Sequence, residues 1–390
     1  MKKTIIAASL TALAMGPAFA AINPHNEAMG KETTYDEKSD NQKGKLTGGW
    51  YYQEENVQEN TDLNHGSVST NITLTGGSFD ELIGGNHIKQ PTYKEGTHNV
   101  TIGDTKVTMT GGSVEYFIGG SKANNSDKTT LITGDVTAVI SGGSIGNQSS
   151  TSEYPVSAIG GSYVKSTGNP GEGTPASTTA ETGNISLSIS GGTFYGAVFG
   201  GSVADNYGST EGQKPILKNI SGISELKIQG GKFESSKFGV FGGSAAIGMK
   251  SATTSSGSSV SINNTSETLI DIVGRVVGGD LLTYGGSGEN ATSSKINGST
   301  SVSITGSGEI KTSESVIGGS LLNLLEKDEE SSSTISGTSE IVIDAANAVL
   351  GDEVIGGSYV RTQKDTGDAS ASVKGTSVTI KAGTINGNVV

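Results

Sequence analysis

The stretch Val107-Thr-Met109-Thr-Gly111-Gly112-Ser-Val114, followed by Phe117-Ile118-Gly119-Gly120-Ser121, decides the fold of this chain. Apolar residues alternate with threonine before the first glycine pair, and this period of two predicts an extended strand with one apolar face. The glycine pairs permit positive φ and predict sharp corners where a Cβ would clash. A glycine pair inside a helix costs about 2 kcal/mol relative to alanine, so helix is disfavoured.

The same pattern recurs from residue 66 to residue 390. The second glycine pair of successive copies begins at Gly84, Gly119, Gly160, Gly200, Gly242, Gly285, Gly318 and Gly356, on average about 39 residues apart. In the sixth copy Gly278-Gly279 is an alternative marker, and a ninth copy begins at Val378. Repeats that bury little alone are stabilised by stacking. We therefore predict an all-β chain, a parallel β-helix or β-solenoid of about nine repeats of about 39 residues with variable surface loops.

The number of coils per repeat stays open at this point. One coil per repeat predicts a stack of roughly 43 Å at about 4.8 Å per coil, and two coils predict roughly 86 Å. The composition agrees with a narrow core, because 60 of the 390 residues are glycine and only 5% are aromatic. The chain has no cysteine, which excludes disulfides and thiolate sites.

The chain divides into three parts. Residues 1–20 are predicted to be a signal peptide, with Lys2 and Lys3 at its start, a short apolar stretch, and a small-residue cleavage site ending at Ala20. Residues 21–65 are predicted to be an extension whose Trp50-Tyr51-Tyr52 cluster caps the first coil. Residues 66–390 form the repeat region. The polar stretches 166–184, 205–214, 251–259 and 327–333 are predicted to be projecting loops.

The charge of the chain limits its partners. The net charge is −13, and becomes −15 once Lys2 and Lys3 are removed with the signal peptide. An acidic surface repels nucleic-acid phosphates, so we expect no nucleic-acid partner.

Four features of the sequence resemble catalytic or binding motifs. Gly142-Gly143-Ser144-Ile145-Gly146 matches the nucleophile elbow, but Ser144 belongs to the repeated corner and all four histidines precede it. Gly278-Gly279-Asp280 with Gly285 to Asn290 gives only one imperfect calcium repeat. The carboxylates of Asp271, Asp344, Asp352 and Glu353 fall in separate copies. Tyr163 and Tyr359 follow Gly-Gly-Ser corners, where stacked structural aromatics are expected rather than a ligand-facing file.

From these comparisons we predict that the chain is not an enzyme. We assign no catalytic, cofactor-binding or metal-binding residues and no cofactor. The main enzymatic alternative is a secreted, glycan-active β-helix, which requires clustered carboxylates. A further alternative is a purely structural surface component without a specific ligand.

The signal peptide followed by glycine-rich Thr/Ser/Val repeats with Gly-Gly-Ser corners resembles the passenger region of autotransporter proteins of Gram-negative bacteria. This resemblance implies a right-handed parallel β-helix, export through the inner membrane, and display at the cell surface through a C-terminal outer-membrane β-barrel. Residues 300–390 show no such barrel pattern, and the ninth copy stops within the repeat, so we expect a chain truncated at its C-terminal end.

The expected function is therefore that of an adhesin or structural surface rod. Its expected partners are host or bacterial cell-surface molecules, glycan or protein, bound through the loops. Its expected location is the cell surface, outer membrane or extracellular space of a Gram-negative bacterium.

Overall fold

The computed structural model describes residues 21–22, 32–35, 44–49, 51–52, 63–66, 68–89, 98–124, 129–149, 155–165, 177–206, 214–218, 222–234, 238–248, 251–283, 291–324, 330–362 and 369–390. All regular elements in these ranges are β-strands, and neighbouring strands of successive repeats run parallel. The predicted all-β solenoid is therefore confirmed. The signal peptide predicted over residues 1–20 lies outside the described residues.

Each repeat forms one coil of four consecutive segments. Segment 1 is formed by β6 (Thr70–Leu74), β10 (Thr105–Met109), β14 (Val136–Ile140), β19 (Ile185–Ile189), β24 (Ile223–Ile228), β29 (Gly257–Asn264) and β34 (Thr300–Gly306). Segment 2 begins with β3 (Lys45–Thr47), β7 (Ser78–Ile83) and β11 (Ser113–Ile118). In later coils it is split into β15 (Ser144–Ile145) and β16 (Val156–Ile159), β20 (Thr193–Phe194) and β21 (Ala197–Phe199), β25 (Lys232–Phe233) and β26 (Gly239–Phe241), β30 (Ile270–Ile272) and β31 (Arg275–Val277), β35 (Ile310–Thr312) and β36 (Val316–Ile317), ending with β39 (Val354–Ile355).

The other two segments complete the coil. Segment 3 is formed by β4 (Tyr51–Tyr52), β8 (His87–Lys89), β12 (Lys122–Asn124), β17 (Tyr163–Lys165), β22 (Val203–Asp205), β27 (Ala245–Ile247), β32 (Leu281–Thr283), β37 (Leu321–Leu324) and β40 (Tyr359–Thr362). Segment 4 is formed by β5 (Leu63–His65), β9 (His98–Ile102), β13 (Thr129–Thr133), β18 (Ser177–Thr182), β23 (Lys214–Lys218), β28 (Ala252–Ser255) and β33 (Thr292–Ile296). In the last coils segments 4 and 1 merge into β38 (Ser331–Leu350) and β41 (Ala369–Ile385), and β1 (Ala21–Ile22) and β2 (Glu32–Tyr35) pair with β3 and β6.

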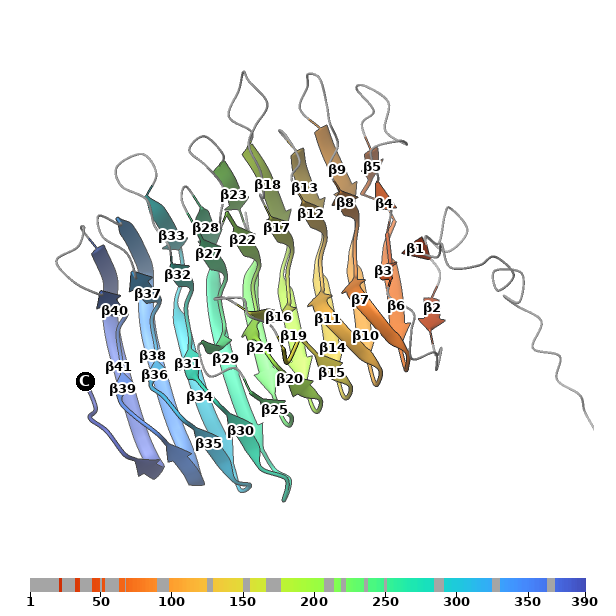
Figure 1. The fold of residues 1–390 in the computed structure, drawn as a ribbon. Coiled ribbons are helices and arrows are strands. Elements are labelled where there is room, and N and C mark those ends of the chain that lie inside the picture. Colours follow the sequence, from red (N-terminus) through yellow and green to blue (C-terminus); the bar gives the residue numbers. More distant parts are fainter. Residues whose placement is uncertain are drawn as a thin grey trace, which may run out of the picture.

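The pairing register shows that one repeat makes one coil. Val107 of β10 lies in register with Ile72 of β6 on one side and with Ala138 of β14 on the other. Segment 3 builds a separate nine-stranded sheet with one strand from each level. Figure 1 shows the coils stacked side by side from the N-terminal to the C-terminal end. The shorter of the two stack lengths, based on one coil per repeat, is therefore the correct one.

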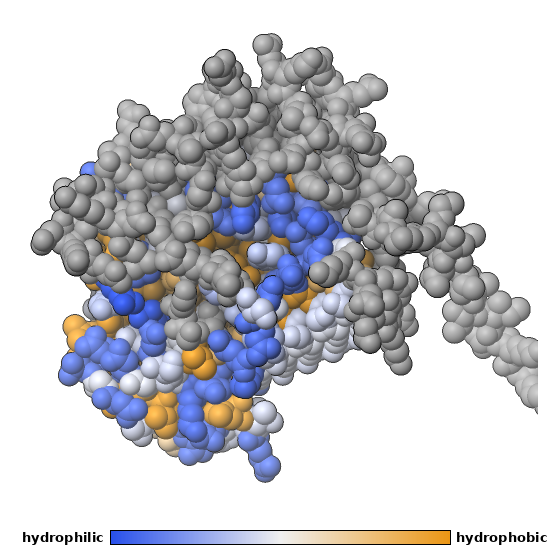
Figure 2. All heavy atoms as spheres, viewed as in Figure 1, coloured by the Kyte–Doolittle hydropathy of each residue, from blue (hydrophilic) through white to orange (hydrophobic). Residues whose placement is uncertain are grey.

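The interior divides into separate apolar clusters. The largest lies between segments 1 and 2 and contains alternate strand residues such as Ile72, Leu74 and Leu82, as the period of two predicts. A second cluster, with Ile88, Val100 and other residues of segments 3 and 4, lies beyond the glycine corner. The outward-facing residues are mostly polar, and on the described part of the face in Figure 2 hydrophilic and hydrophobic residues are interspersed.

A third apolar cluster lies on the outer face of segments 2 and 3, where the chain bends at the second glycine pair. Neighbouring strand residues point to opposite faces, so Leu82 enters the main core while Ile83 enters this outer cluster. The residue two places after the glycine pair joins it from segment 3, as Val203 and Leu281 do. We call this cluster the outer spine. Phe199 and Phe241 stack within it with ring centroids 5.0 Å apart.

The two glycine pairs of each coil are required for different reasons. At the first pair the second glycine has positive φ, for example 84° at Gly77 and 82° at Gly112, as predicted. The second pair does not use positive φ. A Cβ built on Gly120 would lie 2.6 Å from Ser162 Oγ and 3.0 Å from the carbonyl carbon of Gly161 in the next coil. These corners need glycine because successive coils approach too closely for a side chain.

This stacking corrects one marker from the sequence. The sixth corner is Gly278-Gly279 and not Gly285, because Gly242 N–H donates to Val277 O and Gly278 N–H donates to Ile317 O. With Gly278 in place, the neighbouring spacings become 36 and 40 residues, close to the average.

The serine after the second glycine pair forms a buried hydrogen-bond ladder along the solenoid. The backbone N–H of each residue at this position donates to the side chain at the same position in the next coil, over distances of 2.7–3.2 Å. The ladder runs through Asn86, Ser121, Ser162, Ser202, Ser244, Asp280, Ser320 and Ser358. A buried N–H without an acceptor is costly, so the side-chain oxygen explains why the corner reads Gly-Gly-Ser.

Two boundaries from the sequence differ from the structure. The solenoid begins before residue 66: β3 pairs with β7, Gly48 N–H donates to Ile83 O, and β4 pairs with β8. Trp50 lies outside the described residues. Parts of the predicted loops 166–184, 251–259 and 327–333 are strands, namely β18, β28, the start of β29 and the start of β38. Their serines and threonines indicated loops, but several bury their hydroxyls in hydrogen bonds, such as Thr253 and Thr182.

The close approach of the corners gives a direct test. We expect Gly120→Ala to destabilise the protein by about 1–3 kcal/mol, because the new Cβ overlaps the next coil. Gly357→Ala is the matched control, since it occupies the same place in the motif and its Cβ would meet only Thr376 Cγ2 at 3.6 Å. The measurement is the midpoint of urea denaturation of both variants. Equal midpoints would show that the corner does not depend on the missing Cβ.

Candidate functional site

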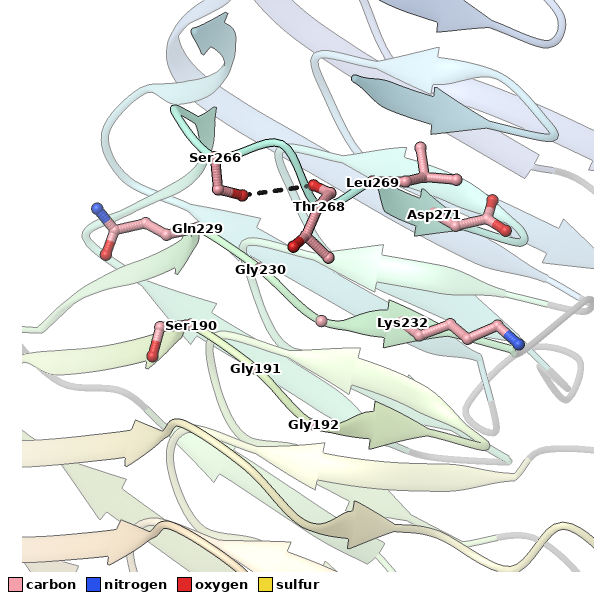
Figure 3. A pocket seen from close by; sticks show the side chains of 11 residues that line it. Ser190, Gly191, Gly192, Gln229, Gly230, Lys232, Ser266, Thr268, Leu269 and Asp271 are labelled. Carbon is pink, nitrogen blue, oxygen red and sulfur yellow. Dashed lines mark hydrogen bonds between the residues drawn. The ribbon is translucent and has the colours of Figure 1, made fainter. Parts of the chain in front are cut away.

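A groove of about 650 Å³ lies on the outside of the first corner. Three successive coils form it: Ser190, Gly191 and Gly192 in one, Gln229 to Lys232 in the next, and Ser266, Thr268, Leu269 and Asp271 in the third. Figure 3 shows Gly191, Gly192 and Gly230 on two neighbouring coils, with Thr268 above them and Gln229 at the opposite end from Lys232 and Asp271. We call the glycine pairs Gly191-Gly192 and Gly230-Gly231 the floor. We call this recess the corner groove.

The corner groove exists because the sixth coil departs from the repeat. In the two preceding coils the first corner is a glycine pair, whereas in this coil the residues Thr265 to Leu269 are inserted between β29 and β30. The inserted residues project as a ledge beside the glycine floor. Exposed Ser266 and Thr268 lie on this ledge and belong to the groove lining.

A single buried side chain fixes the ledge. Asn264 Oδ1 accepts hydrogen bonds from Ser266 N–H at 3.0 Å and Ser266 Oγ at 2.9 Å. Its Nδ2 donates to Thr268 O at 2.8 Å and to Glu309 O of the next coil at 2.7 Å. Asn264 is fully buried, and a Cβ on Gly308 would lie 2.5 Å from its Cγ. The ledge is therefore held in a defined shape before any ligand binds.

The lysines at one end of the corner groove are paired with glutamates of their own coils. Lys232, Asp271 and Lys311 lie in register on three neighbouring coils, and Lys311 forms an ion pair with Glu309 at 2.7 Å. Lys232 forms an ion pair with Glu234, whose hydrogen bond raises the pKa of Lys232. The remaining polar side chains of the groove, Ser190, Gln229, Ser266 and Thr268, are uncharged.

The motif residues considered from the sequence occupy structural positions. Ser144 pairs in register with Ser113 and Thr193 at the first corner, so it stands in the repeat and not on a strand-to-helix elbow. Asp280 is a member of the serine ladder. Its carboxylate accepts from Ser244 N–H, Thr253 Oγ1 and Ser294 Oγ, and burial raises its pKa. Gly285 to Asn290, the other half of the calcium pattern, lie outside the described residues.

The four carboxylates that we considered for glycan cleavage have different surroundings. Asp271 lines the corner groove, and Asp344 forms an ion pair with Lys381 at 3.4 Å. Asp352 accepts a hydrogen bond from Ser315 Oγ, and Glu353 accepts one from Asn388 Nδ2. The last three therefore each have a partner of their own, and the four do not form a cluster. The sequence singles out Asp271 but contains no signal for the groove around it. The groove forms only where residues of three coils come together.

The tyrosines after the second corner are structural, as expected for Tyr163. Tyr163 is buried in the outer spine and stacks on Tyr116, with ring centroids 6.2 Å apart. Tyr359 occupies the same in-register position of segment 3. The two tyrosines are separated by four intervening coils, which place Val203, Ala245, Leu281 and Leu321 there. The two rings therefore do not stack on each other.

A buried charged cluster interrupts the N-terminal end of the outer spine. Lys122 takes the place that Val203 and Leu281 occupy in later coils, and it is only 3% exposed. Its Nζ lies 2.8 Å from Glu81 Oε1 and 5.1 Å from the ring centroids of both Tyr116 and Tyr163. Lys45 Nζ lies 3.0 Å from the same Glu81 oxygen. Sequence reasoning missed this cluster because its members come from three coils.

The pKa values of the cluster follow from its burial and its excess of cations. Burial alone would raise the pKa of Glu81, but Lys122, His87 and Lys45 lower it to about 2. Burial lowers the pKa of Lys122 to about 8, and pairing with Glu81 offsets only part of that effect. Burial raises the pKa of Tyr163, whose hydroxyl donates to Asp205 Oδ2 at 2.8 Å. The cluster ties coils together and leaves little surface for a ligand.

Other kinds of site were also searched for in the described part of the chain. No three His, Asp or Glu side chains there gather in a way that would hold a metal ion. No described segment is a helix of the length and apolarity needed to cross a membrane. No family model matches the chain, and neither the search of curated proteins nor that of solved structures found a match. The corner groove is therefore the candidate site on structural grounds alone.

The ledge of the corner groove depends on Asn264. We expect Asn264→Ala to cost about 1–3 kcal/mol, because it removes the acceptor and donor that hold Ser266 and Thr268. Hydrogen exchange should become faster at residues 265–269 while the neighbouring strands stay protected. Asn263→Ala, on the outward face of β29, is the control. Unchanged exchange over 265–269 would mean that Asn264 does not shape the ledge.

The buried charged cluster should behave as a pair and not as two independent residues. We expect Lys122→Leu to destabilise the protein by up to about 3 kcal/mol, because Glu81 keeps only Lys45 and His87. Adding Glu81→Gln should recover most of the loss, because it removes the buried charge that Lys122→Leu leaves without its main partner. Leucine itself is accepted at this position in two later coils, as Leu281 and Leu321. The measurement is urea denaturation of both variants at pH 7.

The same pair predicts a pH dependence. The pKa of Glu81 is lower in the folded state, so the stability that it contributes is present above about pH 4.5 and is lost as the pH falls towards 2. The double variant should lack this part of the acid transition. A double variant as unstable as Lys122→Leu alone would contradict the pairing.

Proposed function

We propose that this chain is an exported, surface-displayed β-solenoid of the autotransporter-passenger type. In this proposal it acts without enzymatic activity, as an adhesin or structural surface rod in a Gram-negative bacterium. Its partners are host or bacterial cell-surface molecules. The observation that carries the proposal is the corner groove, a recess with a preorganised wall on the outside of a regular stack of coils.

The regular stacking supports the role of a rod. Parallel pairing, glycine corners and the serine ladder repeat from coil to coil, so the outer surface is held by contacts on both sides of each level. A rigid scaffold with exposed side chains on irregular segments is the usual arrangement for recognition.

The lining of the corner groove supports binding over cleavage. Hydrolysis of a glycosidic bond ordinarily uses two carboxyl groups about 5–9.5 Å apart across the bond. Asp271 is the one carboxylate among the described lining residues. One carboxylate does not supply the pair that such hydrolysis uses.

The proposal is tested by display and by cell binding. Antibodies against the folded chain should label intact bacteria as strongly as permeabilised ones. The purified chain without residues 1–20 should bind whole cells in a saturable manner and leave polysaccharides intact. Labelling only after permeabilisation would contradict surface display. Polysaccharide turnover that is lost in Asp271→Asn would favour the enzyme instead.

A further inference from the structure

We infer that the corner groove binds a neutral oligosaccharide; this inference rests on the proposed function as a ligand-binding surface protein. It names the class of ligand that the chemistry of the groove selects. Three properties of the groove lead to it: its uncharged hydrogen-bonding groups, its glycine floor, and the pairing of its lysines with glutamates.

The exposed polar groups of the corner groove match the hydroxyl groups of a sugar. Gln229 presents one amide donor group and one acceptor, and Thr268 presents a hydroxyl that both donates and accepts. The hydroxyl of Ser266 donates to Asn264 Oδ1, which leaves its lone pairs to accept. Side chains that both donate and accept hydrogen bonds suit the neighbouring hydroxyl groups of a sugar, because each sugar hydroxyl is also both a donor and an acceptor.

The floor gives an apolar strip between these polar groups. Gly191, Gly192 and Gly231 are partly exposed, Gly230 is buried, and none of the four adds a polar side chain to the floor, while Leu269 adds an apolar one. A sugar ring has apolar C–H faces and a polar rim. Such a ring would lie on the floor with its hydroxyls directed towards Gln229 and Thr268.

The charges disfavour anionic ligands. Lys232 is paired with Glu234, Lys311 is paired with Glu309, and Asp271 adds a further negative charge between them in register. Binding an anion would require breaking the Lys232–Glu234 pair and approaching Asp271. A neutral sugar leaves the lysine–glutamate pairs intact.

The backbone of the floor is already used, which argues against an added peptide strand. Ser190 N–H donates to Ile140 O, Gln229 N–H to Ile189 O, and Lys232 N–H to Gly192 O. A peptide that joins a sheet needs a free strand edge. Here recognition must come from side chains, as it does for a sugar.

None of the described lining residues is aromatic, so a single groove lacks the ring on which sugars often stack. We therefore expect weak binding of one oligosaccharide to one chain, with a Kd of about 1 mM. Several chains presented together would bind more strongly through avidity. The test therefore measures binding both by single chains and by clustered chains.

The probes are a printed array of neutral and acidic glycans, read with the chain clustered on beads, and the free oligosaccharides that score on it, titrated by NMR. We expect neutral glycans to bind and acidic ones not to. The double variant Gln229→Ala/Thr268→Val should weaken binding about tenfold, because it removes two hydrogen-bonding groups without touching the buried core. The exposed pair Thr110→Ala/Thr137→Val, on other coils, is the control and should bind as the wild type does.

Three outcomes would overturn the inference: no neutral glycan bound by the clustered chain, preference for acidic glycans, or equal binding by both double variants. A cell-binding measurement distinguishes failure of this inference from failure of the proposed function. A chain that binds cells but no neutral glycan remains a surface protein with a different ligand. A chain that binds neither fails both tests.

Discussion

The close approach of backbones at the second glycine pair is the constraint on which the rest of the solenoid depends. Successive parallel strands lie about 4.8 Å apart, and at this bend the corner of one coil rests directly on the corner of the next. The carbonyl oxygens of one level occupy the space that a Cβ of the level before would need. Each corner that is covered by the corner of a following coil therefore requires glycine whatever its φ, and the chain repeats the pair in coil after coil.

The same corner determines what the interior contains. Hydroxyls at the start of segment 1 donate to the carbonyl oxygen of the first glycine of the second pair, as Thr70, Ser224 and Ser258 do. The serine ladder runs beside these bonds, so a polar layer separates the core of segments 1 and 2 from that of segments 3 and 4. Buried backbone groups at a bend need such partners, and small hydroxyl side chains supply them without occupying much volume.

The features of interest are the places where the repeat is broken. Lys122 stands where later coils place Val203 and Leu281, and with Glu81 it produces a buried ion pair with shifted pKa values. The insertion after Asn264 turns a flat corner into a ledge and creates the corner groove. A regular solenoid offers the same surface at every level, so recognition of a particular ligand requires such a departure.

The sequence by itself determined the strands, the corners and the repeat. These depend on the period of two in segments such as 107–110 and on the glycine pairs, which act within a few residues along the chain. It misjudged serine-rich strands such as β28, because their hydroxyls are satisfied only by residues of other segments, as Thr253 is by Asp280. The tertiary structure alone decided the sixth corner, the pairing of Lys122 with Glu81 and the position of the corner groove. Each of these depends on contacts between different coils, whose unequal lengths leave the vertical alignment undefined until the coils are stacked.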